Sequence, residues 1–324
     1  MKSFEYINEL VLDEIRLQNE TLEPKELYEP IWYTLRSGGK RLRPILVLQG
    51  CQLFHDDIEK ALKPALGIEL FHNFTLLHDD IMDKAAVRRN RPTVHVKWNE
   101  NVGILSGDAM MIKSYELLSK TSPEYIPKVF SLFNTTALQV CEGQQFDMDY
   151  EEKDQISLSD YLKMIELKTS VLIGASLKTG AIVGGACEED AFLFYEFGRN
   201  LGIAFQLQDD LLDLYADPLK FGKEPGNDIV SNKKTILLVQ AMQLAQGHTA
   251  VELRSWMEKT DFDRNEKIMA VKTIFDHLDI REKTLEQIRQ YDERAMQCLE
   301  DIPVAASAKQ ELTKAARLIL DRKR

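Results

Sequence analysis

The sequence predicts an all-α protein, and three observations support this interpretation. Apolar residues recur at three- and four-residue spacing along four long stretches, which cover 58–82, 125–146, 161–182 and 191–215. Strand signals are scarce, because the chain has no Asn-Gly or Asp-Gly pair and no long alternating run of β-branched residues. The glycine and proline breaks are short, so no flexible linker divides the chain. We expect one domain over residues 1–324, built from about a dozen helices.

The composition favours a globular protein that does not bind nucleic acid. Hydrophobic residues make up 44% of the chain, which is ample for a core, and charged residues make up 29%, as in ordinary globular proteins. The formal net charge is −11. Nucleic-acid binding depends on neutralising phosphates with cations, so this excess of acid argues against such a partner and is most simply interpreted as an aid to solubility.

Cysteine usage and the N-terminus indicate a cytoplasmic protein. The four cysteines form no C-x-x-C pair, which favours free thiols in a reducing compartment. The first fifteen residues carry acids and no apolar core of a signal peptide. The most apolar long stretch, 170–186, is interrupted by Lys178 and is too short for a membrane span.

Two aspartate triplets are the first candidates for a functional site. Asp79-Asp80-x-x-Asp83 ends one apolar helical stretch, and Asp209-Asp210-x-x-Asp213 ends another. Residues four apart lie on one face of a helix, one turn apart, so the first and third carboxylates of each triplet should point the same way. Hard oxygen ligands of this kind suit Mg²⁺. Acids at a helix C-terminus are disfavoured by the helix dipole, which predicts a compensating cation nearby.

Basic residues accompany both triplets. A glycine turn at 37–39 is followed by Lys40, Arg41 and Arg43; this is no P-loop, because Arg41 follows the lysine where a P-loop has Ser or Thr. Glycines let backbone amides approach a phosphate, and arginine binds its oxygens bidentately. The remaining cations follow the triplets and are Arg88, Arg89, Lys223 and Lys233. Together they predict a site for anionic, phosphate-bearing substrates.

In this order, the motifs resemble the trans-isoprenyl diphosphate synthases, and they span about residues 38–235. They are Gly39-Lys40-Arg41-Leu42-Arg43-Pro44, His72, the first triplet, Arg88-Arg89-x-x-Pro92-Thr93, Gly143-Gln144-x-x-Asp147, Lys168-Thr169, Phe205-Gln206 with the second triplet, and Gly222-Lys223 to Lys233-x-Thr235. One departure is Asn90, where the family usually has glycine, and it bears only on the local turn.

The resemblance implies an all-α bundle around a central cavity, usually as a homodimer. The six aspartates Asp79, Asp80, Asp83, Asp209, Asp210 and Asp213 would hold three Mg²⁺ ions. The allylic diphosphate would be bound by Arg88, Lys168, Gln206 and Lys233. Isopentenyl diphosphate would be bound at Gly39, Lys40, Arg43, His72 and Arg89. Gln144 and Asp147 would support Lys168, and Lys223 would assist closure.

By this resemblance the reaction is a head-to-tail condensation of isopentenyl diphosphate with dimethylallyl, geranyl or farnesyl diphosphate. Metals and cations stabilise the leaving diphosphate, and the allylic carbocation needs a pocket free of water. Thr169 and carbonyl groups of a glycine-interrupted helix at Lys168 would face that cation. The departing diphosphate is the family's usual base, so His78 is interpreted as a structural residue.

Two other classes of protein are alternatives to the prenyltransferase interpretation. A class I terpene cyclase, a lyase, ionises a single substrate, so Lys40, Arg43 and Arg89 would have no purpose, and its second motif is normally a mixed Asn/Ser/Glu one. A non-catalytic regulatory subunit usually loses one triplet, whereas both are complete here.

Product length depends on the residues that precede the first triplet. Phe74 and Phe71 lie about 7.5 and 12 Å along the helix axis from Asp79, and the resemblance places a short-chain floor at Phe74. Thr75 is small where farnesyl-forming animal-type enzymes carry an aromatic, and the triplet lacks the two-residue insertion of typical bacterial farnesyl enzymes. We therefore expect geranylgeranyl diphosphate first, farnesyl diphosphate next and longer polyprenyl chains third. The alternative is that Phe71 and Phe74 are only core aromatics.

Overall fold

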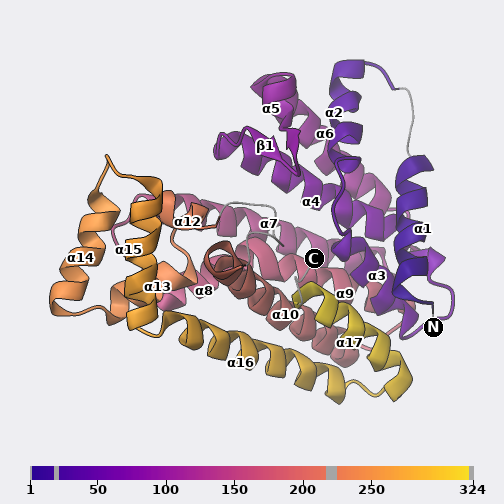
Figure 1. Cartoon of the computed structure of the whole chain (residues 1–324). Coiled ribbons are helices and arrows are strands. Elements are labelled where there is room, and N and C mark those ends of the chain that lie inside the picture. The colour runs from indigo at the N-terminus through magenta and orange to yellow at the C-terminus, as the bar shows by residue number, and fades with distance from the viewer. Residues whose placement is uncertain (1, 18–21, 217–224, 321–324) are drawn as a thin grey trace. The chain divides into compact units, whose positions relative to one another are not determined.

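A computed structural model describes residues 2–17, 22–216 and 225–320, and helices dominate each range. Figure 1 follows them from indigo α1 to yellow α17. Up to residue 118 the elements are α1 Phe4–Leu17, α2 Lys25–Leu35, α3 Leu42–Gln52, the 3₁₀ turn η1 Glu59–Ala61, α4 Leu62–Met82, the strands β1 Val87–Arg88 and β2 Arg91–Pro92, α5 Val94–Lys97 and α6 Glu100–Leu118.

The remaining elements are helical throughout. They are α7 Ile126–Glu151, α8 Leu158–Ile165, the π-helical turn η2 Glu166–Ser170, α9 Val171–Gly184, α10 Glu188–Tyr215, α12 Asn227–Val230, α13 Ile236–Leu244, α14 Gly247–Glu258, α15 Arg264–His277, α16 Ile280–Asp301 and α17 Ala306–Leu320.

The prediction of an all-α fold is confirmed, and the four stretches with helical spacing correspond to α4, α7, the α8–α9 segment and α10. The described residues form more helices than the dozen expected, because short helices such as α5 and α12 add to the long ones. The antiparallel pair β1–β2 was not predicted. All four cysteines are free, as expected. No helix within the described ranges is long and apolar enough to cross a bilayer.

The chain divides into two compact units, each described by itself. The first unit comprises Met1–Asn134, Ala175–Tyr195 and Pro303–Leu312, and the second comprises Thr135–Gly174, Glu196–Ile302 and Thr313–Arg324. Four of the five boundaries fall inside α7, α9, α10 and α17, and the fifth lies between α16 and α17. The central cavity implied by the resemblance therefore stays a prediction, as does the extent of a single domain over 1–324.

Helix α4 is the central helix of the first unit, because nearly all of its residues are buried or half-buried. Its buried side chains include Leu66, Leu70 and Phe71, as expected of a helix covered all round. It packs along α6, where the Ser114 hydroxyl donates a 2.7 Å hydrogen bond to the Gly67 carbonyl. Near the triplet, a Cβ added to Gly103 of α6 would lie 2.8 Å from Ile81 Cδ1, so this packing reaches the end of α4 that bears the first aspartate triplet.

The second unit has its own core around the C-terminal half of α10. Leu207 and Leu211 of α10 are buried with residues of α8, α13, α15 and α16. In Figure 1 the helices α12, α13, α14 and α15 form one orange group, and contacts among these elements and with α16 hold it together. The core leaves the second aspartate triplet on the last two turns of a firmly packed helix.

Candidate active site

The first aspartate triplet lies on the last turn of α4. The backbone N–H of Asp83 donates to the Asp79 carbonyl at 2.8 Å, so the two residues stand one turn apart on the same face, as predicted. Asp83 is exposed, whereas Asp80 is only 6% exposed. Burial raises the pKa of Asp80, and the charge of Arg88 opposes that shift. The middle aspartate thus differs in environment from the third.

Arg88 is the cation that compensates this triplet. Its Nε donates to Asp80 Oδ1 at 2.7 Å and its Nη2 donates to Asp79 Oδ2 at 3.1 Å. The prediction that a cation offsets acids at this helix C-terminus is confirmed. Arg88 also connects the triplet to the β1–β2 hairpin on which it lies.

The hairpin has a tight two-residue turn formed by Arg89 and Asn90. Both have positive φ, 53° and 59°, as a type I′ turn requires. Arg88 pairs with Arg91 across the strands. Asparagine tolerates the left-handed region better than most residues, which explains how this chain accommodates a position where the family usually has glycine.

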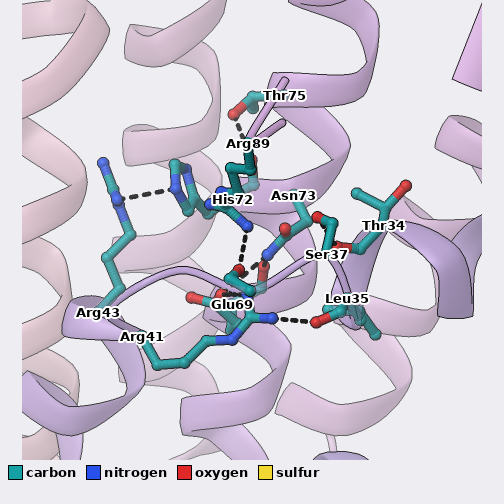
Figure 2. A network of polar contacts seen from close by, with 11 residues as sticks. Thr34, Leu35, Ser37, Arg41, Arg43, Glu69, His72, Asn73, Thr75 and Arg89 are labelled. Carbon is teal, nitrogen blue, oxygen red and sulfur yellow. Dashed lines mark hydrogen bonds and ion pairs between the residues drawn. The ribbon is translucent and has the colours of Figure 1, made fainter. Parts of the chain in front are cut away.

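The basic turn before α3 and the middle of α4 come together in the first unit. Figure 2 shows Arg43 pointing at His72, with Arg43 Nη1 and His72 Nε2 2.9 Å apart. Burial and the charge of Arg43 hold the pKa of His72 well below its ordinary value, and burial lowers the pKa of Arg43 to about 10. A neutral His72 can accept the arginine's hydrogen bond, so these two predicted substrate residues support one another.

Arg41, Glu69 and Asn73 form a buried network beneath these residues that the sequence analysis did not predict. Arg41 Nη1 and Glu69 Oε1 are 2.7 Å apart, with both side chains 3% exposed. Asn73 Nδ2 donates to the same Oε1 at 2.9 Å, and Arg41 also donates to the Leu35 carbonyl (Figure 2). The signal that could have revealed this pair was an acid directly flanked by apolar residues, in Ile68-Glu69-Leu70-Phe71.

Arg89 lies over the glycine turn. Its Nη1 donates to the Gly38 carbonyl, and a Cβ added to Gly39 would lie 2.8 Å from the Arg89 guanidinium carbon. Gly39 has φ 115°, which also favours glycine. The structure thus brings Gly39 and Arg89 together as predicted. Lys40, which follows Gly39 in the sequence, is exposed.

The second triplet repeats the pattern of the first. Asp209 and Asp213 are half-buried, and Asp210 is 5% exposed. Oδ2 of Asp210 accepts from the Tyr161 hydroxyl at 2.5 Å and from the Ile236 N–H at 3.1 Å, and Oδ1 accepts from Gln206 Nε2 at 3.0 Å. Burial raises the pKa of Asp210, while these hydrogen bonds oppose the shift. Protein donors thus engage both oxygens of the middle aspartate.

Asp228 is a further acid beside the second triplet that was not predicted. Its N–H donates to Asp213 Oδ2 at 3.1 Å, and its carbonyl accepts from the Lys233 N–H at 2.9 Å. Burial raises the pKa of Asp228 to about 7, although Lys233 opposes the shift. Asp210, Asp213, Asp228 and Lys233 are among the residues that line a small cavity of about 10 Å³, close to the space that one water needs. Asp228 lies between Gly222 and Lys233 of the family motif, and this position could have identified it from the sequence.

Lys168 lies on the π-helical turn η2 and pairs with Asp147 of α7, its Nζ 2.5 Å from Oδ2. The predicted support of Lys168 by Asp147 is therefore present. A Cβ added to Gly143 would lie 2.2 Å from the Lys168 nitrogen, so only glycine permits this approach. The expected interruption of the helix exists, but its form is a π turn and not a break at a glycine.

Thr169 of the same turn connects to the second triplet through Gln206. The Thr169 hydroxyl donates to Gln206 Oε1 at 3.2 Å, and Gln206 in turn binds Asp210. Gln144 is half-buried on α7. Lys223 lies outside the described residues, so its predicted role is not examined by the structure.

The predicted chain-length residues lie in the middle of α4. Phe71 is fully buried against Phe133 at a ring-centroid distance of 5.1 Å, which favours a core role for it. Phe74 is half-buried and lies 4.7 Å from the His78 ring. Thr75 is half-buried and donates to the His72 carbonyl at 2.8 Å.

His78 Nε2 lies 3.2 Å from the Ile104 carbonyl of α6, which supports the interpretation of His78 as a structural residue.

The carboxylates fit Mg²⁺ in chemistry. No group of three or more His, Cys, Asp or Glu side chains in residues 2–17, 22–216 and 225–320 is arranged to hold a metal alone. Mg²⁺ usually takes one or two carboxylates and completes its octahedron with water and substrate phosphate. Asp79 with Asp83, and Asp209 with Asp213, offer such pairs of oxygen donors.

Comparison with known proteins gives a consistent result. The family model described as polyprenyl synthetase matches residues 24–275. Over 222 residues the chain is 42% identical to a geranylgeranyl diphosphate synthase of Methanosarcina mazei, covering 68% of each. It is 32% identical to a geranylfarnesyl diphosphate synthase of Aeropyrum pernix, covering 94% of this chain and 96% of the relative. A crystal structure of a geranylgeranyl pyrophosphate synthase superposes with TM-score 0.95 at 41% identity over the full length of both chains.

Proposed function

Because the chain belongs to the polyprenyl synthetase family, we propose that it is a Mg²⁺-dependent synthase whose main product is geranylgeranyl diphosphate. It is a trans-prenyltransferase and a short-chain prenyl diphosphate synthase, and its catalysis depends on a divalent metal. The observation that carries the metal-dependent reaction is the matched pair of triplets, each with a buried middle aspartate and less buried flanking carboxylates. The proposed product rests on the similarity to geranylgeranyl diphosphate synthases.

We assign metal binding first to the flanking aspartates. Asp79, Asp83, Asp209 and Asp213 would supply oxygen ligands for up to three Mg²⁺ ions. The contacts of Asp80 with Arg88 and of Asp210 with Tyr161 favour positioning roles for these two middle aspartates. When bound, Mg²⁺ neutralises the allylic diphosphate and lowers the barrier to its departure.

The basic residues would divide between two diphosphates. Arg43, His72 and Arg89, with Gly39 and Lys40, would bind isopentenyl diphosphate. The support for this assignment is the Arg43–His72 contact and the hydrogen bond that Arg89 donates to the Gly38 carbonyl of the glycine turn. The allylic diphosphate would be held by Arg88, Lys168, Gln206 and Lys233, with Gln144 beside Lys168 and Lys223 as an aid to closure.

The residues then control the fate of the cation. Departure of diphosphate breaks the allylic C1–O bond, and the double bond of isopentenyl diphosphate attacks C1 to form the new C–C bond. A proton passes to the departing diphosphate, which restores the alkene. The π turn at η2 departs from the regular helical hydrogen-bond pattern, which supports the proposal that carbonyls near Thr169 face the cation.

We also propose a homodimer in a reducing compartment, the cytoplasm. The large apolar residues Ile104, Leu105 and Ile112 of α6 are exposed at 44%, 59% and 69%. Adjacent exposed apolar side chains are typical of association surfaces, which supports a second copy as the partner. Four free cysteines fit a reducing compartment.

Product length is the part of the proposal that needs direct measurement. Relatives include geranylgeranyl and geranylfarnesyl synthases, so products of twenty and twenty-five carbons are the two main competing outcomes. Farnesyl diphosphate is a third, shorter product that the assay must also detect. Labelled isopentenyl diphosphate should be incubated with each allylic diphosphate and Mg²⁺, and the dephosphorylated products separated by chromatography. Geranylgeraniol as the main product supports the proposal, and a main product of another length contradicts it.

A further inference from the structure

A hollow in the first unit, apart from the residues assigned above, combines cations with aromatic rings. Its volume is about 380 Å³, and one wall is a single face of α2 and the residues at its ends. The residues on this wall recur once per turn of the helix, so they share one face. They are Lys25, Tyr28, Glu29, Trp32, Tyr33 and Arg36. The facing wall is formed by Arg91, Lys97 and Trp98. We call this hollow the α2 cavity.

The α2 cavity is strongly basic in an acidic protein. It has four cations and a single carboxylate, that of Glu29, while the whole chain carries a formal charge of −11. Among the described residues, no carboxylate lies within ion-pair distance of Lys97 or Arg91. Since their charges are not neutralised by an acid of the same unit, an anion would gain from both.

Aromatic rings hold two of these cations, Lys97 and Arg91, in place. Lys97 Nζ lies 4.0 Å from the Tyr33 ring centroid and 4.4 Å from that of Trp98, and Arg91 Cζ lies 4.3 Å from that of Tyr33. The Tyr33 and Trp98 rings meet edge to face at 5.2 Å, and the Tyr33 hydroxyl donates to the Pro92 carbonyl at 2.7 Å. Cation–π contacts fix the positions of the charges without supplying a counter-anion.

We propose that the α2 cavity binds a small molecule that carries a diphosphate group on a body with a flat or unsaturated group. Lysine and arginine are the residues that bind phosphate oxygens, and ring faces bind flat or unsaturated groups. A volume of about 380 Å³ lies in the range of small-molecule sites. A prenyl diphosphate and a nucleoside diphosphate share this chemistry, so the experiment separates them.

The cavity is connected to residues of the candidate active site. Arg91 pairs across the hairpin with Arg88, which binds Asp79 and Asp80, and Arg36 directly precedes the glycine turn. A ligand that contacts Arg91 and Arg36 would therefore act on the segments that position Arg88 and Arg89. The binding proposal itself does not depend on the assigned reaction.

Tryptophan fluorescence provides a direct assay, because Trp32 and Trp98 of the cavity are two of the chain's three tryptophans. The full chain should be titrated, in the presence of a metal chelator, with geranylgeranyl diphosphate, ADP and inorganic diphosphate, and binding confirmed by calorimetry. We expect saturable binding of at least one of the two organic ligands, tighter than that of inorganic diphosphate. Tighter binding of geranylgeranyl diphosphate would identify a prenyl diphosphate as the ligand, and tighter binding of ADP would identify a nucleoside diphosphate.

Three variants locate the binding. The double variant Lys97→Glu/Arg36→Glu should weaken it by at least about tenfold, as expected for losing charge-assisted hydrogen bonds. Lys120→Glu, an exposed lysine of the same unit outside the cavity lining, and Arg43→Ala should both retain it. Absence of saturable binding by either organic ligand, equal affinity for inorganic diphosphate, or unchanged binding in the double variant would overturn the proposal.

Discussion

The phenol of Tyr161 donates a 2.5 Å hydrogen bond to Asp210, the middle aspartate of the second triplet. Tyr161 is 1% exposed and Asp210 is 5% exposed, and the two are 49 residues apart in sequence. The same carboxylate accepts from Gln206 and from the Ile236 N–H. Asp210 therefore connects α8, α10 and the start of α13, the elements adjoining Lys168, Asp209 and Lys233.

Tyr161→Phe should lower kcat by about tenfold while the protein remains folded. The phenylalanine retains the packing and removes one hydrogen bond to a charged group, worth about 1.5–3 kcal/mol. Tyr215→Phe is the matched control, since it removes a 2.7 Å hydrogen bond to Asp276 in the same unit. Steady-state kinetics and the Mg²⁺ concentration for half-maximal rate should change in Tyr161→Phe alone. Equal kinetic effects in both variants would show that the Tyr161 contact is only structural.

Removal of the basic residues should separate the two substrates. Arg43→Ala and Arg89→Ala should mainly raise KM for isopentenyl diphosphate, whereas Lys233→Ala should lower kcat or raise KM for the allylic substrate. Each lost contact should cost about 1.5–3 kcal/mol. The comparison requires initial rates with each substrate varied in turn, and Arg289→Ala, on the exposed surface, as the control. If Arg43→Ala affected both substrates equally, the division would be wrong.

The buried Arg41–Glu69 pair should be important for stability. Glu69→Ala leaves the Arg41 guanidinium buried without its carboxylate, which should cost about 3–5 kcal/mol. Glu116→Ala removes the partner of Lys120 in an exposed pair and should cost less than about 1 kcal/mol. Chemical denaturation of both variants measures the difference. Similar unfolding midpoints for the two variants would refute this account of the pair.

Substitutions on α4 should change product length. Phe74→Ala should lengthen the products, because it removes bulk along the path proposed for the growing chain, and Thr75→Phe should shorten them. Phe54→Ala, which truncates an aromatic residue outside α4 that packs on Phe194, is the control. Chromatography of dephosphorylated products gives the answer. Unchanged lengths in both α4 variants would place the floor elsewhere.

The sequence predicted those features that depend on local spacing. The helices that end in the triplets follow from apolar periodicity, and a compensating cation follows from the helix dipole. Two contacts among the residues that the family motifs grouped are present in the first unit, Arg43 with His72 and Arg89 with the glycine turn, while their role as one substrate site stays a prediction.

Features that depend on distant partners were not predictable from spacing. The three aspartates of a triplet look alike in sequence, and only the folded chain buries Asp80 and Asp210 against Arg88 and Tyr161. Arg41 reaches Glu69 from a backbone with φ 49°, which no pattern indicates. The π turn at Lys168 lies in close contact with Gly143 of α7, and a contact between distant residues cannot be read from spacing.

The central claim is that both triplets act through Mg²⁺ to ionise the allylic diphosphate. The most direct test is the condensation rate of the wild type, Asp79→Asn, Asp209→Asn and the exposed-surface control Asp261→Asn, each after chelation and after stepwise addition of Mg²⁺. The wild type and Asp261→Asn should be inactive with chelator and recover with Mg²⁺. Asp79→Asn and Asp209→Asn should stay at least about a thousandfold slower, since metal assistance supplies several kcal/mol and each 1.36 kcal/mol is tenfold in rate. Wild-type activity that survives chelation, or near-normal rates in either triplet variant with Mg²⁺ present, would contradict the claim.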